Sequence, residues 1–222
     1  MKKRIVCFGD SNTWGFNKLD ESRYPEEVRW TGRLAGMLGP DYTVIEEAQN
    51  GRTTVWDDPI ENRMAGLKYL WPCMESQSPF DLIIIMLGTN DTKCYFSQTA
   101  QNIADGAGRL VWTAMISPYG PDKYPPQVLL VAPIRIEDHE VYRHMFGVQA
   151  AEKSEGFSKA FRLVADKYGC HFMDASLYAK PGKADGLHLD PEGHALLAKA
   201  MYEKVKEILG RTEKERPAAG SE

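Results

Sequence analysis

The six residues Leu82-Ile83-Ile84-Ile85-Met86-Leu87 form a continuous apolar run, and the polar turn Gly88-Thr89-Asn90-Asp91 follows directly. An apolar run without alternation is typical of a strand that helices cover on both faces. Residues 128–131 have the same character, and shorter runs occupy residues 5–8, 42–45 and 171–173. Since helical patterns separate these runs, we predict a single-domain α/β fold, a three-layer α/β/α sandwich with a mostly parallel five-stranded sheet.

Helical signals fill the stretches between the predicted strands. Pro25-Glu26-Glu27 predicts a helix start, residues 28, 31, 34, 35 and 38 fall on one face, and Gly39-Pro40 stops the pattern. Further helices are expected near residues 60–76, 98–117 and 149–168, and a last one from Asp190-Pro191 to Gly210. The domain is therefore expected to span residues 1–210, with 211–222 as a polar, disordered tail.

Composition excludes several classes of protein. The chain has 222 residues, 43% of them hydrophobic and 26% charged, with a formal net charge of −4. This acidic balance argues against a dedicated binder of nucleic acid or of an anionic membrane. The apolar run near the N-terminus ends at Gly9-Asp10, which is too short for a signal peptide, and no stretch reaches the length of a membrane span. Four scattered cysteines without a C-x-x-C pair fit a reducing compartment, so we expect a cytoplasmic protein.

Polar residues with catalytic potential follow the predicted strands. Ser11 follows the first strand, Asn50-Gly51 the second, Asn90 the third, and Asp185 with His188 the fifth. Taken alone, each is an ordinary turn or capping residue. Because the carboxyl ends of parallel strands gather along one edge of a sheet, the set supplies a hydroxyl, a base, an orienting acid and an amide donor in one place. Acyl transfer from serine needs these parts.

The motifs Gly9-Asp10-Ser11, Gly51, Gly88-Thr89-Asn90-Asp91 and Asp185-x-x-His188 closely resemble, in order and spacing, those of the SGNH (GDSL-type) hydrolase family. The resemblance covers roughly residues 4–209 and implies a flavodoxin-like arrangement of the sheet. Finer segments, such as Gly51-Arg52-Thr53-Thr54, resemble the arylesterase and acyltransferase (perhydrolase) branch of that family.

The resemblance implies a role for each motif residue. Ser11 is the nucleophile, His188 the general base and then the general acid, and Asp185 the group that orients His188. The backbone N–H groups of Ser11 and Gly51 and the side-chain amide of Asn90 form the oxyanion hole. Gly186 is expected to ease the tight turn that brings Asp185 back to His188. Asp10 is expected to shape the nucleophile turn, and His194 to be structural.

The expected substrate is a small acyl ester. We predict a narrow pocket for acetyl and other short acyl groups, formed by Asp10, Asn12, Trp14, Phe16, Arg52, Thr53 and Ile134. The charged segment 134–150 is expected to help wall the site. An acetylated sugar is an expected substrate by analogy with the wider family, and the branch implies acyl transfer to alcohols or peroxide and a homo-oligomer. No cofactor is expected. A metal site built from Asp10, Asp185, His188 and Asp190 has no known ligand spacing to support it.

Three alternatives from other classes remain open at this point. The first is a catalytically idle carbohydrate-binding module on the same scaffold. The second is a nucleotide-binding protein, although residues 9–15 contain neither a G-x-G-x-x-G pattern nor a P-loop lysine. The third is a thiol hydrolase that uses Cys7 or Cys94, although Cys7 falls inside a predicted strand, where an inert thiol is expected.

Overall fold

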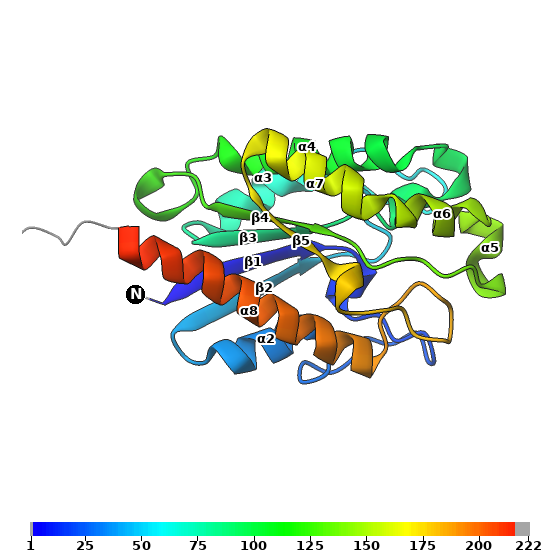
Figure 1. Ribbon diagram of the computed structural model, residues 1–222, viewed down its shortest axis with the longest axis horizontal. Helices are drawn as coiled ribbons and strands as arrows, with labels where there is room; N and C mark the ends of the chain where they lie inside the picture. Colours follow the sequence, from blue (N-terminus) through cyan, green and yellow to red (C-terminus); the bar gives the residue numbers. More distant parts are fainter. Residues whose placement is uncertain (1, 216–222) are drawn as a thin grey trace, which may run out of the picture.

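A five-stranded, all-parallel sheet lies at the centre of the computed structural model, which describes residues 2–215 (Figure 1). The strand order is β2-β1-β3-β4-β5, so β1 and β3 are central and β2 and β5 lie at the edges. The strands are β1 (Lys3–Gly9), β2 (Tyr42–Ala48), β3 (Leu82–Met86), β4 (Gln127–Ala132) and β5 (His171–Asp174). The five strands expected from the sequence and the predicted α/β class are thus confirmed.

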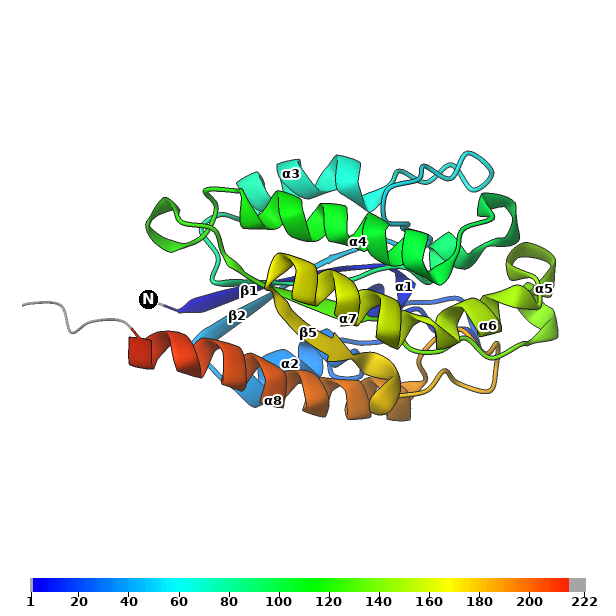
Figure 2. The same cartoon turned by 45° about the horizontal axis from the view of Figure 1, so that its top comes forward.

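Helices cover both faces of the sheet and make the three layers. The α3, α4 and α7 helices lie on one face, and α2 and α8 on the other (Figures 1 and 2). The α-helices are α1 (Ser11–Trp14), α2 (Trp30–Leu38), α3 (Gly66–Gln77), α4 (Ala100–Met115), α5 (Glu140–Phe146), α6 (Gln149–Glu155), α7 (Phe157–Tyr168) and α8 (Pro191–Glu215). Short 3₁₀ helices are η1 (Asn90–Thr92), η2 (Cys94–Phe96), η3 (Pro121–Lys123) and η4 (Ala175–Leu177). None of the helices within residues 2–215 has the length and apolar character needed to cross a bilayer.

The central position of β3 in the sheet explains why its sequence is apolar throughout. All five of its residues are buried. Ile83 and Ile85 pack into the core beneath α3, α4 and α7, whereas Leu82, Ile84 and Met86 pack into the core beneath α2 and α8. Because each side chain of this size contributes roughly 1.5–3 kcal/mol on burial, the two-sided strand anchors both layers.

Several helix boundaries differ from the sequence prediction. The helix expected near residues 60–76 begins only at Gly66. The second helix begins at Trp30 rather than Pro25, because residues 25–29 form a turn in which the N–H groups of Val28 and Arg29 both donate to the Pro25 carbonyl. The helix predicted over 149–168 is interrupted at Gly156, where a Cβ would lie 2.9 Å from the Cβ of Ala100 on α4.

The last helix continues beyond Gly210 to Glu215. Nothing lies within 4 Å of a Cβ placed at Gly210, and good helix formers follow it before Pro217. Residues 211–215 of the predicted tail are thus part of the helix, and residues 216–222 lie outside the described residues.

His194 packs between α8 and the start of α2 as a neutral side chain, which agrees with the structural role predicted for it. It is fully buried on α8, its Nδ1 accepts a hydrogen bond from the Trp30 N–H at 3.2 Å, and burial lowers its pKa to about 4. Between pH 6.5 and about 4 the unfolded chain binds a proton here that the folded chain does not, so stability is lost as the pH falls through this window.

The loss should approach about 3 kcal/mol, since one pKa unit corresponds to about 1.4 kcal/mol. Urea unfolding of the protein and of His194→Gln at several pH values measures it. Gln retains an acceptor for Trp30, so the difference between the two curves isolates the titration of this group. A difference that does not change with pH would contradict the prediction.

Candidate active site

The turn after β1 presents Ser11 at the carboxyl edge of the sheet. Asp10 caps the short helix α1, and its carboxylate accepts a hydrogen bond from the Asn12 N–H at 3.0 Å. Burial raises the pKa of Asp10 to about 6. The carboxylate therefore shapes the nucleophile turn, as the sequence predicts, instead of facing a substrate.

The loop that carries the acid and the base folds back on itself. One oxygen of Asp185, Oδ1, accepts from the backbone N–H groups of Leu187 and His188, both at 2.9 Å. Gly186 has φ +67°, a left-handed conformation that favours glycine, and a Cβ there would lie 2.5 Å from the Glu137 carbonyl oxygen. The sharp turn expected at Gly186 is thus present, and it leaves the second oxygen of Asp185 free to face the His188 ring.

Ser11, His188 and Asp185 form one continuous chain of hydrogen bonds. The Ser11 Oγ lies 2.9 Å from His188 Nε2, and His188 Nδ1 lies 2.6 Å from Asp185 Oδ2. Burial opposes ionisation of Asp185, but the hydrogen bonds from the His188 ring and from two backbone N–H groups outweigh it and hold the pKa below its usual value. The carboxylate is therefore charged and fixes the tautomer with the proton on Nδ1. Nε2 is left to accept the proton of Ser11.

Asn12 ties the nucleophile turn to the histidine loop. Its side-chain amide donates to the Leu187 carbonyl at 3.2 Å, and its Oδ1 accepts from the Leu189 N–H at 2.9 Å. These two bonds hold the backbone on both sides of His188. Asn12, expected in the substrate pocket, is instead a positioning residue, because both of its polar atoms are engaged in this clamp.

Two further residues with donor groups line the same pocket as Ser11. Gly51 has φ +78°, and among the described residues no backbone carbonyl accepts from its N–H. The Asn90 side-chain amide donates one hydrogen bond to the Arg52 carbonyl at 3.2 Å, which fixes its orientation and leaves its second N–H available. The residues expected to form an oxyanion hole therefore lie together on one side of the pocket.

Aromatic rings flank the His188 imidazole. Phe16 lies with its ring centroid 4.7 Å from that of His188, and Tyr142 from α5 lies at 5.8 Å. An imidazolium that forms during a reaction would be attracted by these rings, as cations are by aromatic faces. Tyr142 was not anticipated from the sequence, although its segment was expected to wall the site.

A pocket of about 200 Å³ opens over Ser11 and His188. Its walls differ in chemistry. The apolar wall consists of Phe16, Tyr142, Met145, Phe146 and Leu187. The polar wall consists of Asn50, Gly51, Glu61, Arg63, Asn90 and Lys93.

Of the residues predicted for the substrate pocket, Phe16 lines it and the others do not. Trp14 is covered by the Arg23 guanidinium, which lies 5.1 Å from its ring. The Arg52 guanidinium donates to the carbonyls of Gly9 and Glu47. Thr53 is buried and donates to the Trp56 carbonyl, and Ile134 packs in the core on the α2 and α8 side. The prediction was wrong for Arg52, Thr53 and Ile134 because these side chains are buried away from the pocket, and wrong for Trp14 because Arg23 covers its ring.

A buried ion-pair cluster supports the polar wall. Lys93 is 1% exposed, and its Nζ contacts Asp58 at 2.7 Å and also Glu61. Tyr95 donates to the same Asp58 oxygen at 2.6 Å. Together with these contacts, the N–H groups of residues 60 and 61 hold the Asp58 carboxylate. We name residues 57–64 the 57–64 loop; the cluster fixes this loop against Gly51.

Asp91, the last residue of the Gly88-Thr89-Asn90-Asp91 motif, has a structural role. Both of its oxygens accept from Thr54, through the backbone N–H and the hydroxyl. Burial raises its pKa to about 6. The carboxylate holds the 51–54 turn in place and does not reach the pocket lining.

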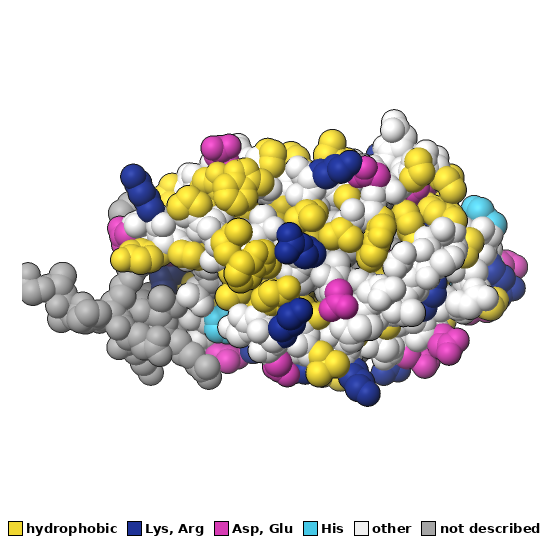
Figure 3. All heavy atoms as spheres, turned by 90° about the horizontal axis from the view of Figure 1, so that it is seen from above, with side chains coloured by type: hydrophobic (Ala, Val, Ile, Leu, Met, Phe, Trp, Pro, Cys, Tyr) yellow, Lys and Arg dark blue, Asp and Glu magenta, His cyan; other side chains and the backbone are white. Residues whose placement is uncertain are grey.

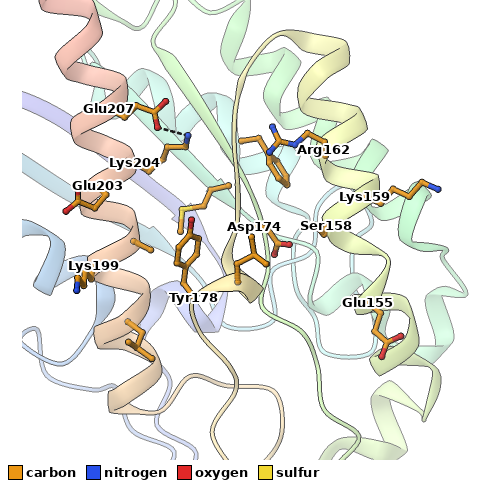
Figure 4. A pocket seen from close by; sticks show the side chains of 15 residues that line it. Glu155, Ser158, Lys159, Arg162, Asp174, Tyr178, Lys199, Glu203, Lys204 and Glu207 are labelled. Atoms are coloured by element: carbon orange, nitrogen blue, oxygen red, sulfur yellow. Dashed lines mark hydrogen bonds and ion pairs between the residues drawn. The ribbon is translucent and has the colours of Figure 1, made fainter.

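Other parts of the described structure offer no comparable chemistry. A larger groove of about 1060 Å³ lies between α7 and α8 along the edge strand β5, and charged side chains of both helices rim it (Figure 4). No histidine lines this groove.

Cys7 is buried in β1, where burial raises the pKa of its thiol, and Cys94 lies at the surface outside the lining of the pocket. Among residues 2–215, no group of three or more His, Cys, Asp or Glu side chains is placed to hold a metal ion.

Comparisons with known proteins find a matching family model and similar solved structures. The model of the GDSL-like lipase/acylhydrolase family matches residues 7–196. The structure of Est24, a carbohydrate acetylesterase from Sinorhizobium meliloti, is similar with a TM-score of 0.87 and 40% sequence identity, covering 93% of this chain and 100% of that one. The aryl esterase of M. smegmatis has a TM-score of 0.87 and 37% identity, covering 92% and 99%.

A curated relative, an acetylxylan esterase from Xylanibacter ruminicola, is 25% identical over 226 residues. The match covers 91% of this chain and 43% of that protein, so the chain spans less than half the length of this relative.

Proposed function

Because the chain belongs to the GDSL-like lipase/acylhydrolase family and is a carboxylic ester hydrolase, we propose that it cleaves short-chain, acetyl-type esters through an acyl-enzyme on Ser11. The observation that carries the proposal is the hydrogen-bonded chain from Ser11 through His188 to Asp185 at the floor of the pocket. The alternative of an idle carbohydrate-binding module has no need for such an alignment.

The geometry supports a two-step reaction. Ser11 Oγ attacks the ester carbonyl while its proton passes to His188 Nε2, and Asp185 stabilises the imidazolium. The carbonyl oxygen, now negative, receives hydrogen bonds from the N–H groups of Ser11 and Gly51 and from the Asn90 amide. His188 then donates its proton to the departing alcohol. Water, deprotonated by the same imidazole, attacks the acyl-enzyme and releases the acid and the free Ser11 hydroxyl.

Labelling with a fluorophosphonate, followed by peptide mapping, tests the proposal. We expect a stoichiometric adduct at Ser11 in the unmodified protein and none in Ser11→Ala. A folded protein that forms no adduct would favour the binding-module alternative. Ser158, which lines the other groove, supplies a matched control, since Ser158→Ala should leave the labelling unchanged.

The small pocket predicts a preference for short acyl groups. A volume of about 200 Å³ between two fixed walls accepts an acetyl group but leaves little room for an octanoyl chain. We expect p-nitrophenyl acetate to have a higher kcat/KM than p-nitrophenyl octanoate, measured by release of nitrophenolate. Faster turnover of the octanoate would contradict this reading of the pocket.

The proposal includes acetylated sugars as acyl donors and alcohols or peroxide as acyl acceptors. The acetylesterase neighbours and the polar wall support the first. The apolar wall supports the second, because Phe16, Met145 and Phe146 reduce the access of water to the acyl-enzyme. Product analysis in water with added alcohol separates hydrolysis from transfer.

The proposal extends to self-association as a homo-oligomer. Hydrophobic side chains gather on the outer face formed by α3, α4 and α7 (Figure 3). Large exposed members include Trp71, Trp112, Ile116 and Leu163, with exposed fractions from 40 to 53%. Apolar patches of this kind often mark contacts with another protein. Light scattering is expected to give a mass of at least twice 25.0 kDa; a single species of 25.0 kDa would contradict self-association.

A further inference from the structure

We infer that Arg63 recognises a carboxylate carried by the ester substrate, so that the enzyme prefers anionic esters over neutral ones of the same shape. The inference rests on the proposed function, since it assigns a substrate class to the same pocket. It begins from the charges on the polar wall.

The lining of the pocket contains two cations that differ in their partners. Lys93 is buried and paired with both Asp58 and Glu61. Arg63 is exposed, and among the described residues no carboxylate lies within ion-pair distance of its guanidinium. The charge of Lys93 is thus satisfied inside the protein, whereas that of Arg63 is available to a ligand.

The backbone at Arg63 is held rigidly. Its N–H and carbonyl pair with the carbonyl and N–H of Asp58, both at 2.8 Å. Asp58 is itself buried and fixed by Lys93 and Tyr95. Because this anchor is ordered before a ligand arrives, less conformational entropy is lost when the guanidinium forms a hydrogen bond.

The side chain of Arg63 starts beside the reacting centre. A Cβ placed on Gly51 would lie 3.2 Å from Arg63 Cγ and 3.4 Å from its Nε. The stem of the arginine therefore passes over the residue whose N–H is proposed to bind the oxyanion, and a group attached to the bound ester lies within reach of the guanidinium. The planar guanidinium matches a carboxylate through two parallel hydrogen bonds.

Glu61 limits the charge of the ligand. Its carboxylate shares the polar wall and lies 3.3 Å from the same Cβ position on Gly51. Repulsion by Glu61 disfavours a doubly charged group such as a phosphate more strongly than a carboxylate. A single carboxylate is therefore the anion that fits this wall.

Two pairs of matched esters test the inference and locate the carboxylate. Phenyl hydrogen glutarate and phenyl pentanoate differ by a carboxylate on the acyl side. The acetyl esters of meta-hydroxybenzoate and meta-hydroxybenzamide differ on the alcohol side. For at least one pair, the ratio of kcat/KM for the anionic ester to that for the neutral ester should exceed one, and the pair that shows it identifies the side. Because a salt bridge at a partly exposed site is screened, the ratio should fall in about 1 M salt.

Substitution of Arg63 gives the decisive comparison. We expect Arg63→Gln to lower the anionic-to-neutral ratio roughly 5- to 10-fold, and Arg63→Lys to keep part of it. Arg109→Gln, which removes the same charge from an exposed position on α4, should leave the ratio unchanged.

Two results would overturn this inference and leave the proposed function standing. One is an unchanged ratio in Arg63→Gln. The other is a ratio of one or below for both pairs of esters in the unmodified protein. If no ester showed turnover that depends on Ser11, the proposed function would fail, and the inference with it.

Discussion

Replacing Asp185 with asparagine is expected to lower kcat by about 10⁴, or about 5.5 kcal/mol in the barrier, as the corresponding change does in other Ser-His-Asp enzymes. The reason lies in the acceptor role of both carboxylate oxygens. Oδ1 receives two backbone N–H groups, and Oδ2 receives the His188 ring N–H. Asparagine has one acceptor oxygen and one donor NH₂ group. The NH₂ group must therefore take the position of either Oδ1 or Oδ2 and face a donor there.

The two hydrogen bonds from the backbone N–H groups decide which position the NH₂ group takes. With the oxygen kept toward Leu187 and His188, the NH₂ group faces Nδ1 and forces the ring proton onto Nε2. That tautomer cannot accept the proton of Ser11. Kinetics on a short-chain ester measure the loss, and Asp190→Asn is the matched control, because the Asp190 carboxylate accepts from the Gly193 N–H at the start of α8 and is outside the Ser11–His188–Asp185 chain. A loss smaller than tenfold in Asp185→Asn would mean that the carboxylate is not needed to orient His188.

Replacing Lys93 with alanine is expected to lower the free energy of unfolding by about 3–5 kcal/mol, the usual effect of removing one partner of a buried ion pair. The Asp58 side chain is fully buried. Burial tends to raise its pKa, but the hydrogen bonds from Lys93 and Tyr95 outweigh this and hold the pKa below the usual value. Without Lys93, a buried negative charge keeps only neutral donors.

Urea unfolding measures this change, and Lys68→Ala provides the matched control. Lys68 pairs with Asp57 on the same loop, but its side chain is 60% exposed, so the control should lose less than about 1 kcal/mol. Adding Asp58→Asn to a Lys93→Met variant should recover part of the stability, since both charges are then removed. A Lys93→Ala variant as stable as the control would show that the cluster does not hold the 57–64 loop.

The sheet and the catalytic motif were predictable because both depend on strong local signals. The apolar run 82–87 is typical of a strand buried on two faces, and the residues that follow each strand of a parallel sheet meet at one edge. This is why Ser11, Asn90 and His188 lie together although they are far apart in the chain.

The walls of the pocket were harder to predict, since they depend on where loops fold back. Arg52 and Thr53 lie next to Gly51 in sequence, yet backbone carbonyls capture their side chains. Arg63 and Tyr142 come from a loop and a short helix whose placement depends on long-range contacts, such as the Lys93 cluster and the ring of His188. The start of α2 was also predicted wrongly. The N–H groups of Val28 and Arg29 donate to the Pro25 carbonyl in a separate turn, so the helix begins only after it.

The Asn12 clamp also has a consequence for how the molecule is made. The nucleophile turn follows β1, whereas its partners at positions 187–189 are synthesised 175 or more residues later. Contacts of such sequence separation form late in folding, since closing a long chain segment costs entropy before the contact stabilises it. The serine of a nascent chain therefore has no base beside it, and the reactive hydroxyl appears only when the fold is complete.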